Sequence, residues 1–113
     1  MTRLCFRRYT HTFFDLDSEQ QLDQLGHPDQ AHFIEKFNQI LIECFEEHLG
    51  VTIAHNDILW SCSTRREKMS YHIKVDSSQF YWDVSSRKTD LKNFARLVES
   101  ALRNTPGFYY YEQ

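Results

Sequence analysis

The sequence predicts an α+β fold in which an antiparallel sheet carries two helices on one face. Two long segments repeat apolar residues at helical spacing. Shorter segments alternate apolar and polar residues with the two-residue period of strands. Their order along the chain is strand, helix, strand, strand, helix, strand. This order is typical of the split βαβ pattern of ferredoxin-like and RRM-like folds.

Composition indicates one small domain over residues 1–113. The chain is 41% hydrophobic, which is enough for a core, and 26% charged. A net charge of −3 argues against a uniformly basic nucleic-acid binder, although a local basic patch still attracts nucleic acid. No apolar run approaches the length of a membrane span, so no membrane partner is expected.

The cysteines indicate a reducing compartment. Cys5, Cys44 and Cys62 are odd in number and form no Cys-x-x-Cys pair. Neither a disulfide framework nor a zinc site is therefore expected. Reduced thiols are typical of intracellular proteins, and we expect a nuclear or cytoplasmic location.

The first strand and the first helix have the clearest signals. His11–Asp17 contains aromatic and β-branched residues, which predict a strand. This segment ends in an acidic pair. A polar loop follows, with a helical turn expected at Glu19–Leu25. Pro28–Leu49 then shows one apolar stripe and predicts a helix. Asp29 suits its positive end, and Gly50 suits its C-terminal stop.

The second half of the chain predicts a hairpin and a second helix. Asp57–Ser63 and Met69–Val75 have strand composition and are joined by a polar turn, so they should pair as a β-hairpin. Thr89–Asn104 repeats apolar residues on one face and predicts the second helix. Phe80–Val84 and Phe108–Tyr111 are candidates for further strands.

Polar and charged side chains share one face of two of these strands. Residues two apart in a strand point the same way, so Asp15 and Asp17 project together. Ser70 and His72 do the same on the second strand, and Lys68 lies on their side. Carboxylates bind hard divalent cations, whereas hydroxyl, imidazole and ammonium groups suit phosphate oxygens. If the two strands are neighbours, this face becomes a site for a metal ion and a triphosphate.

Two further residues are candidates for nucleotide contact. Ser63 lies two residues after Ser61, on the same face of the strand that should pair with the second polar strand. Arg66 lies in the hairpin turn. Polar residues at a sheet edge and solvated charge in a turn are the alternative interpretations. The sequence favours core packing for Trp60. It leaves open whether four other aromatic residues stack on bases or pack in the core: Tyr71, Phe80, Tyr81 and Trp82.

These residues resemble the first two motifs of the archaeo-eukaryotic primase superfamily. Phe14-Asp15-Leu16-Asp17 is similar to its hydrophobic-Asp-x-Asp/Glu motif, and Ser70-Tyr71-His72 is similar to its Ser-x-His motif. The intervening helix, the segment Asp57-Ile58-Leu59 and the lysine at position 68 look like the primase-polymerase (PrimPol) branch and the primases of large DNA viruses. The resemblance covers residues 11–104.

The resemblance implies a DNA primase or DNA-directed polymerase, a nucleotidyltransferase of DNA replication. Asp15 and Asp17 would hold two Mg²⁺ or Mn²⁺ ions and, with His72, form the catalytic set. Lys68, Ser70 and His72 would contact the phosphates of the incoming nucleoside triphosphate. A 3′-hydroxyl would attack the α-phosphate, directed by a single-stranded DNA template. A helicase is a candidate partner, and a viral replication site is a candidate location.

One departure from the family concerns its third motif, a hydrophobic residue followed by Asp on a strand after the second helix. Nothing after Asn104 fits that motif, and Glu112 is the only acidic residue there. We therefore expect this chain to be the N-terminal part of a catalytic core, with the missing C-terminal part as a further candidate partner. The chain alone is then expected not to synthesise nucleic acid.

Two other functions remain open at this level. A non-catalytic RRM-like module would bind nucleic acid or a protein without chemistry, and the missing third carboxylate favours it. A metal-dependent nuclease would use similar carboxylates but does not require Ser-x-His with a nearby Lys. Taken alone, Asp15 and Asp17 also suit a strand end, and His72 suits an ordinary strand position.

Overall fold

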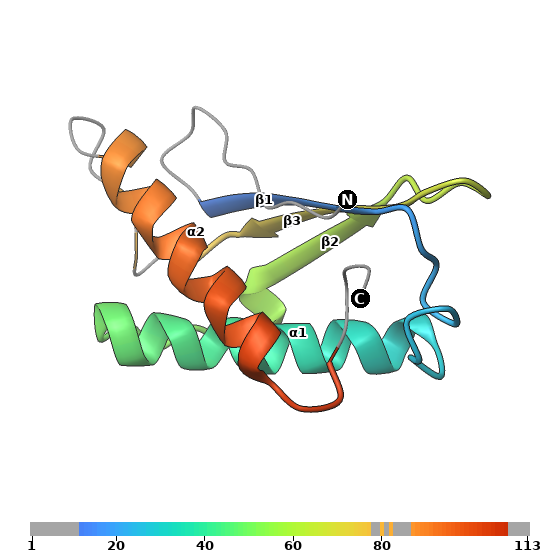
Figure 1. Cartoon of the computed structure of the whole chain (residues 1–113). Helices are drawn as coiled ribbons and strands as arrows, with labels where there is room; N and C mark the ends of the chain where they lie inside the picture. Colours follow the sequence, from blue (N-terminus) through green and yellow to red (C-terminus); the bar gives the residue numbers. More distant parts are fainter. Residues whose placement is uncertain (1–11, 78–79, 81, 83–86, 109–113) are drawn as a thin grey trace.

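The fold combines three strands with two α-helices, and a computed structural model describes residues 12–77, 80, 82 and 87–108. The strands are β1 (Thr12–Ser18), β2 (Ile58–Cys62) and β3 (Met69–Val75). The α-helices are α1 (Gln30–Cys44) and α2 (Arg87–Asn104). A π-helical segment, η1 (Phe45–Leu49), extends α1, and a 3₁₀ turn, η2 (His55–Asp57), precedes β2. The α+β class is confirmed (Figure 1).

The sheet brings the two polar strands together. Its order within the described residues is β1-β3-β2, and β3 pairs antiparallel with both neighbours. β1 and β2 therefore run parallel to each other with β3 between them, as the split βαβ pattern predicts. The register sets Asp15 opposite His72 and Asp17 opposite Ser70. The predicted hairpin of β2 and β3 is also confirmed.

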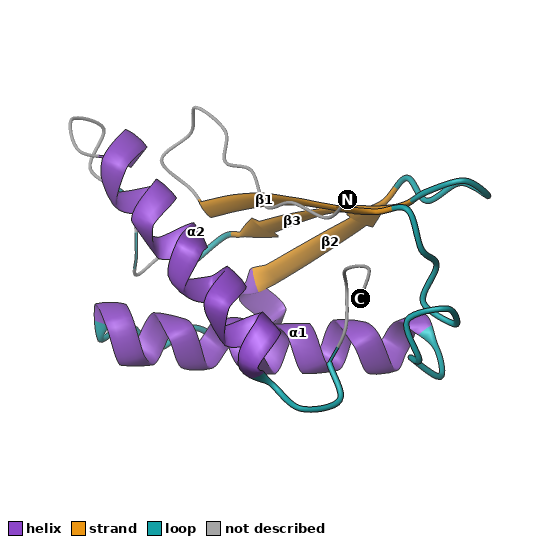
Figure 2. Ribbon diagram, viewed as in Figure 1, coloured by secondary structure: helices purple, strands orange, loops and turns teal. Residues whose placement is uncertain are grey.

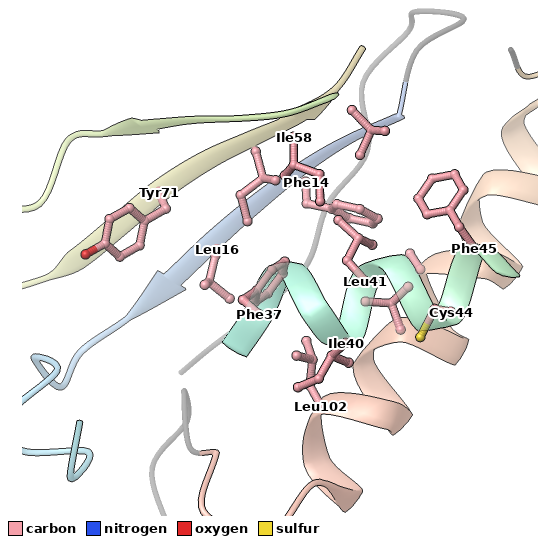
Figure 3. Packing of buried hydrophobic residues seen from close by; sticks show 14 of the residues in the cluster. Phe14, Leu16, Phe37, Ile40, Leu41, Cys44, Phe45, Ile58, Tyr71 and Leu102 are labelled. Carbon is pink, nitrogen blue, oxygen red and sulfur yellow. The ribbon is translucent and has the colours of Figure 1, made fainter. Parts of the chain in front are cut away.

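The helices pack against one face of the sheet, and no other described helix or strand covers the opposite face, called the open face below (Figure 2). Alternate residues of β1 and β3 enter the core, among them Phe14, Leu16 and Ile73, all almost fully buried. Figure 3 shows Phe14 and Leu16 beside Phe37 and Leu41 of α1. Because strand side chains alternate between faces, the residues between these core positions project from the open face.

The first helix begins two residues later than the sequence predicts. Asp29 has extended backbone angles (φ −162°, ψ 174°) and is the N-cap, with its carboxylate accepting a 2.7 Å hydrogen bond from the His32 N–H. At the other end, the helical run continues through η1 to Leu49 as expected. Gly50 stops it with φ +64°, a left-handed conformation that favours glycine.

The two expected extra strands are not formed at their described positions. Phe80, Trp82 and Phe108 lie outside any strand, and the rest of Phe80–Val84 and Phe108–Tyr111 falls outside the described residues. Trp82 and Phe108 serve the core instead: both are buried, and Trp82 Nε1 donates a 2.6 Å hydrogen bond to Thr12 Oγ1. The polar loop does contain its turn, with the Leu25 N–H bonded to the Gln21 carbonyl.

Of the aromatic residues considered for base stacking, Tyr71 and Trp82 are buried in the core, and Trp60 and Phe80 are partly buried and pack against it. Tyr71 is 3% and Trp82 is 6% exposed. Trp60 packs edge-on against Phe37 and donates its indole N–H to Asn38 Oδ1 at 2.7 Å. Tyr81 lies outside the described residues. No helix in the described part of the chain is both long and apolar enough to cross a membrane.

The buried thiol of Cys44 is predicted to react slowly in the folded protein. Burial, reinforced by the negative charges of Glu47 and Glu43, raises the pKa of Cys44 from its ordinary value of 9.0 to about 11. Cys62, in contrast, is exposed. With Cys5 replaced by serine, DTNB at pH 8 is expected to modify one thiol quickly and the other only on unfolding. Equal rates would contradict the burial of Cys44.

The same pKa shift gives a pH dependence of stability. The folded state favours the neutral thiol, so the contribution of Cys44 is fully present below pH 9. It is lost as the pH rises from 9.0 towards about 11. Urea unfolding of the wild type and of Cys44→Ala should therefore converge across this interval, because alanine carries no titrating group.

Candidate functional site

The open face carries a polar depression at the end of the sheet formed by β1, β3 and the β2–β3 turn. It has a volume of about 670 Å³. Its lining combines carboxylates, hydroxyls, cations and one imidazole: Asp15, Asp17, Ser63, Thr64, Arg65, Lys68, Ser70 and His72. Six of these residues were predicted site residues, and the paired strands and their turn bring them together.

Asp15 and His72 form the first of two cross-strand pairs. His72 Nδ1 lies 2.6 Å from Asp15 Oδ1, and because an ionised carboxylate only accepts, the ring nitrogen donates. Nε2 then points to the other side of the ring, where Ser63 Oγ lies 3.5 Å away. The side chains are partly exposed, 43% for His72 and 24% for Asp15. The pair therefore fixes the imidazole orientation while leaving it open to a ligand.

Asp17 and Ser70 form the second pair, two residues further along each strand. Ser70 Oγ donates to Asp17 Oδ1 at 2.7 Å, and Ser63 Oγ donates to Ser70 Oγ at 3.3 Å. Lys68 Nζ lies 3.5 Å from the same Asp17 oxygen. A chain of two hydroxyls, from Ser63 just after β2 and Ser70 of β3, thus ends on a carboxylate of β1, with an ammonium group beside it.

The hairpin turn and the loop after β1 each supply a residue that the sequence analysis did not identify. Thr64 lines the polar depression, and its Oγ1 accepts from the Ser70 N–H at 3.0 Å and donates to the Ser70 carbonyl at 3.2 Å. Gln21, from the loop after β1, donates through Nε2 to the carbonyls of Arg65 at 2.6 Å and Arg66 at 3.3 Å. The hydrogen bonds of Thr64 and Gln21 go to backbone groups, so no pattern of side chains in the sequence predicts them.

The arginine of the site is Arg65, although the sequence pointed to Arg66. Arg65 pairs with Lys68 in an isolated bridge that closes the hairpin. This closure puts Arg65 and Lys68 at the base of the turn, where both line the polar depression. Arg66 is exposed at the tip of the turn and is not part of the lining.

The carboxylates suit a cation that takes most of its ligands from elsewhere. Among the described residues, no group of three or more His, Cys, Asp or Glu side chains is arranged to hold a metal ion. Mg²⁺ is commonly held by one or two carboxylates together with water and substrate phosphates rather than by a full protein cage. Asp15 and Asp17, side by side on one strand, fit that requirement. Glu112 lies outside the described residues.

The chain matches no family model, no curated protein and no solved structure. Its function is therefore inferred from the chemistry of the polar depression.

Proposed function

We propose that the polar depression binds a nucleoside triphosphate with a divalent cation, as the nucleotide site of a primase-polymerase type of nucleotidyltransferase. One observation carries the proposal: two acidic residues of β1 meet Ser70 and His72 of β3 in adjacent cross-strand pairs on an open sheet face. Carboxylates that attract cations and donors that attract phosphate are thereby held within one depression.

The acidic side of the depression is assigned to the metal. Asp15 and Asp17 would hold Mg²⁺ or Mn²⁺, which in two-metal sites activates the attacking oxygen and stabilises the leaving pyrophosphate. Asp15 has a second task in this proposal, because its bond to His72 Nδ1 orients the ring. The Nε2 atom is then directed away from Asp15, toward the hydroxyl of Ser63.

The remaining lining residues are assigned to the phosphates. Lys68 and Arg65 supply positive charge, and arginine can bind phosphate in a bidentate way. Ser63 and Ser70 supply hydroxyls on the same face. Phosphoryl transfer depends on positioning and electrostatic stabilisation rather than on a covalent nucleophile, so a site of charges and hydrogen-bond donors suits it.

The charge balance makes the cation necessary for tight binding. Two carboxylates in the lining offset the charges of its arginine and its lysine. A triphosphate is strongly anionic, so it would meet little net attraction in the depression on its own. With a divalent cation on the carboxylates, the same lining becomes strongly positive. Binding of nucleotide is therefore expected to require metal.

Calorimetric titration of the 113-residue chain with ATP tests this proposal. Affinity in Mn²⁺ or Mg²⁺ is expected to exceed affinity in EDTA by at least about tenfold, since charge-assisted contacts are each worth about 1.5–3 kcal/mol. Equal affinity with and without metal would overturn the proposal.

A second titration separates the non-catalytic alternative. A plain nucleic-acid-binding module should bind a single-stranded oligonucleotide with an affinity that falls as salt rises, and without a metal requirement. If the chain binds the oligonucleotide in this way and binds no ATP in any buffer, that module replaces the nucleotidyltransferase as the better assignment.

A further inference from the structure

The strand register divides the open face into rows of three residues, with one residue from β1, one from β3 and one from β2 or from the position directly after it. The two polar rows are Asp15–His72–Ser61 and Asp17–Ser70–Ser63. The adjoining row, Phe13–Lys74–Leu59, has a different character because two of its three members are large and apolar. The face therefore changes from polar to apolar within one step along the strands.

The third row lines an apolar depression of about 260 Å³ next to the polar one. Its lining is Phe13, Leu59, Trp60, Ser61, His72, Ile73 and Lys74. His72 lines both depressions, so the two adjoin each other. Leu59 is 49% exposed, and Lys74 Nζ lies 5.7 Å from the centre of the Phe13 ring.

We propose that the row Phe13–Lys74–Leu59 is the nucleobase subsite of the nucleotide whose phosphates occupy the polar depression, an inference that rests on the proposed function. Rows lie two residues apart, or about 7 Å. This separation leaves room for the pentose between a base and its α-phosphate. Phe13 offers an aromatic surface and Leu59 an apolar one, while Lys74 adds a cation next to the ring.

The placement of the other aromatic residues supports this subsite. Tyr71 and Trp82 are buried, and the indole N–H of Trp60 is engaged with Asn38. Phe13 lies on the same sheet face as Asp15, because the two residues are two apart in β1, and it lines the apolar depression. Stacking on an aromatic ring accepts every base, since each base has a π-face. The subsite is therefore expected to bind purine and pyrimidine nucleotides alike.

Calorimetry in Mn²⁺ with ATP and with inorganic triphosphate tests the subsite apart from the phosphate site. The wild type is expected to bind ATP about tenfold more tightly than inorganic triphosphate, the value of one base–aromatic contact. Phe13→Ala should remove that advantage and leave the affinity for inorganic triphosphate unchanged. Leu59→Ala should reduce ATP affinity by about threefold. Leu97→Ala, at the other strongly exposed leucine of the described residues, is the matched control and should change nothing.

The possible outcomes separate the two proposals. If inorganic triphosphate binds with metal and Phe13→Ala leaves ATP affinity intact, the nucleobase subsite is wrong and the proposed function stands. If Phe13→Ala weakens only the binding of a single-stranded oligonucleotide, the row serves a template strand and the subsite is again wrong. If neither ATP nor inorganic triphosphate binds with metal, both proposals fail. Unchanged thermal unfolding of Leu59→Ala shows that its effect on ATP is local.

Discussion

Replacing Phe33 with alanine is expected to lower the free energy of unfolding by about 3–5 kcal/mol, the usual cost of a Phe-to-Ala change in a core. Phe33 is fully buried in α1. Its ring stacks on Phe108 at 5.1 Å between centroids and on Tyr71 at 5.9 Å. It also meets Trp60 edge-on at 6.2 Å. One side chain thus joins α1 to β2, β3 and the segment after α2.

The size of this loss matters because small domains have little stability to spare. A typical domain unfolds with a free energy of about 5–15 kcal/mol, so the variant should lose a large fraction of it. Urea unfolding followed by circular dichroism measures the change. Phe13→Ala is the matched control, since Phe13 lies on the open face and is only partly buried. A loss below about 1.5 kcal/mol for Phe33→Ala would contradict the central role of this aromatic cluster.

Much of the sheet followed from the two-residue period of its strands. β3 has the predicted bounds, Met69–Val75, and β1 ends one residue later than predicted, at Ser18. His11, the predicted first residue of β1, lies outside the described residues. Both strands bury one apolar face, which fixes which side chains enter the core. The common face of Asp15 and Asp17, and that of Ser70 and His72, follows from the same alternation. The order of the elements then made pairing of β1 with β3 the expected arrangement.

The side-chain contacts within the site could not be predicted from the sequence, because they depend on the register in which the strands pair. A shift of the pairing by two residues would keep every side chain on its face but give Asp15 and Asp17 other partners. Thr64 and Gln21 act on backbone groups, and Gln21 does so across 44 residues of sequence. Phe13 differs: its position two residues before Asp15 already assigned it to the open face. The alternation of the strand therefore placed Phe13 on the open face, but the adjacent Phe14 is also aromatic and enters the core.

The geometry of the hairpin turn determines which of two adjacent arginines lines the polar depression. Arg65 and Arg66 are equivalent by composition, and both lie between the predicted strands of the hairpin. The bridge between Arg65 and Lys68 closes the turn around Arg66 and Glu67. That closure assigns Arg65 to the polar depression and Arg66 to the exposed tip. Only the pairing pattern distinguishes the two.

Replacing Asp15 or Asp17 with asparagine is expected to weaken metal-dependent ATP binding by at least about 100-fold. Loss of an outer partner of a metal ligand already costs about 10–100-fold, and these residues are the proposed ligands themselves. The amide oxygen can still accept the hydrogen bond from His72 or Ser70. The fold should therefore survive, and thermal unfolding checks that it does. Asp90→Asn, an exposed residue of α2, makes the same change of charge away from the site.

The sign of the effect is more informative than its size. Each substitution removes one negative charge from a lining that also contains Arg65 and Lys68. In EDTA, both variants should therefore bind inorganic triphosphate more tightly than the wild type does. If the site binds phosphate through its cations alone, ATP affinity should also rise when Mn²⁺ is present. A metal-bridged site requires opposite changes in the two buffers, because the carboxylates repel a bare triphosphate but hold the cation that attracts it. Increases in both buffers would therefore contradict the metal role of Asp15 and Asp17.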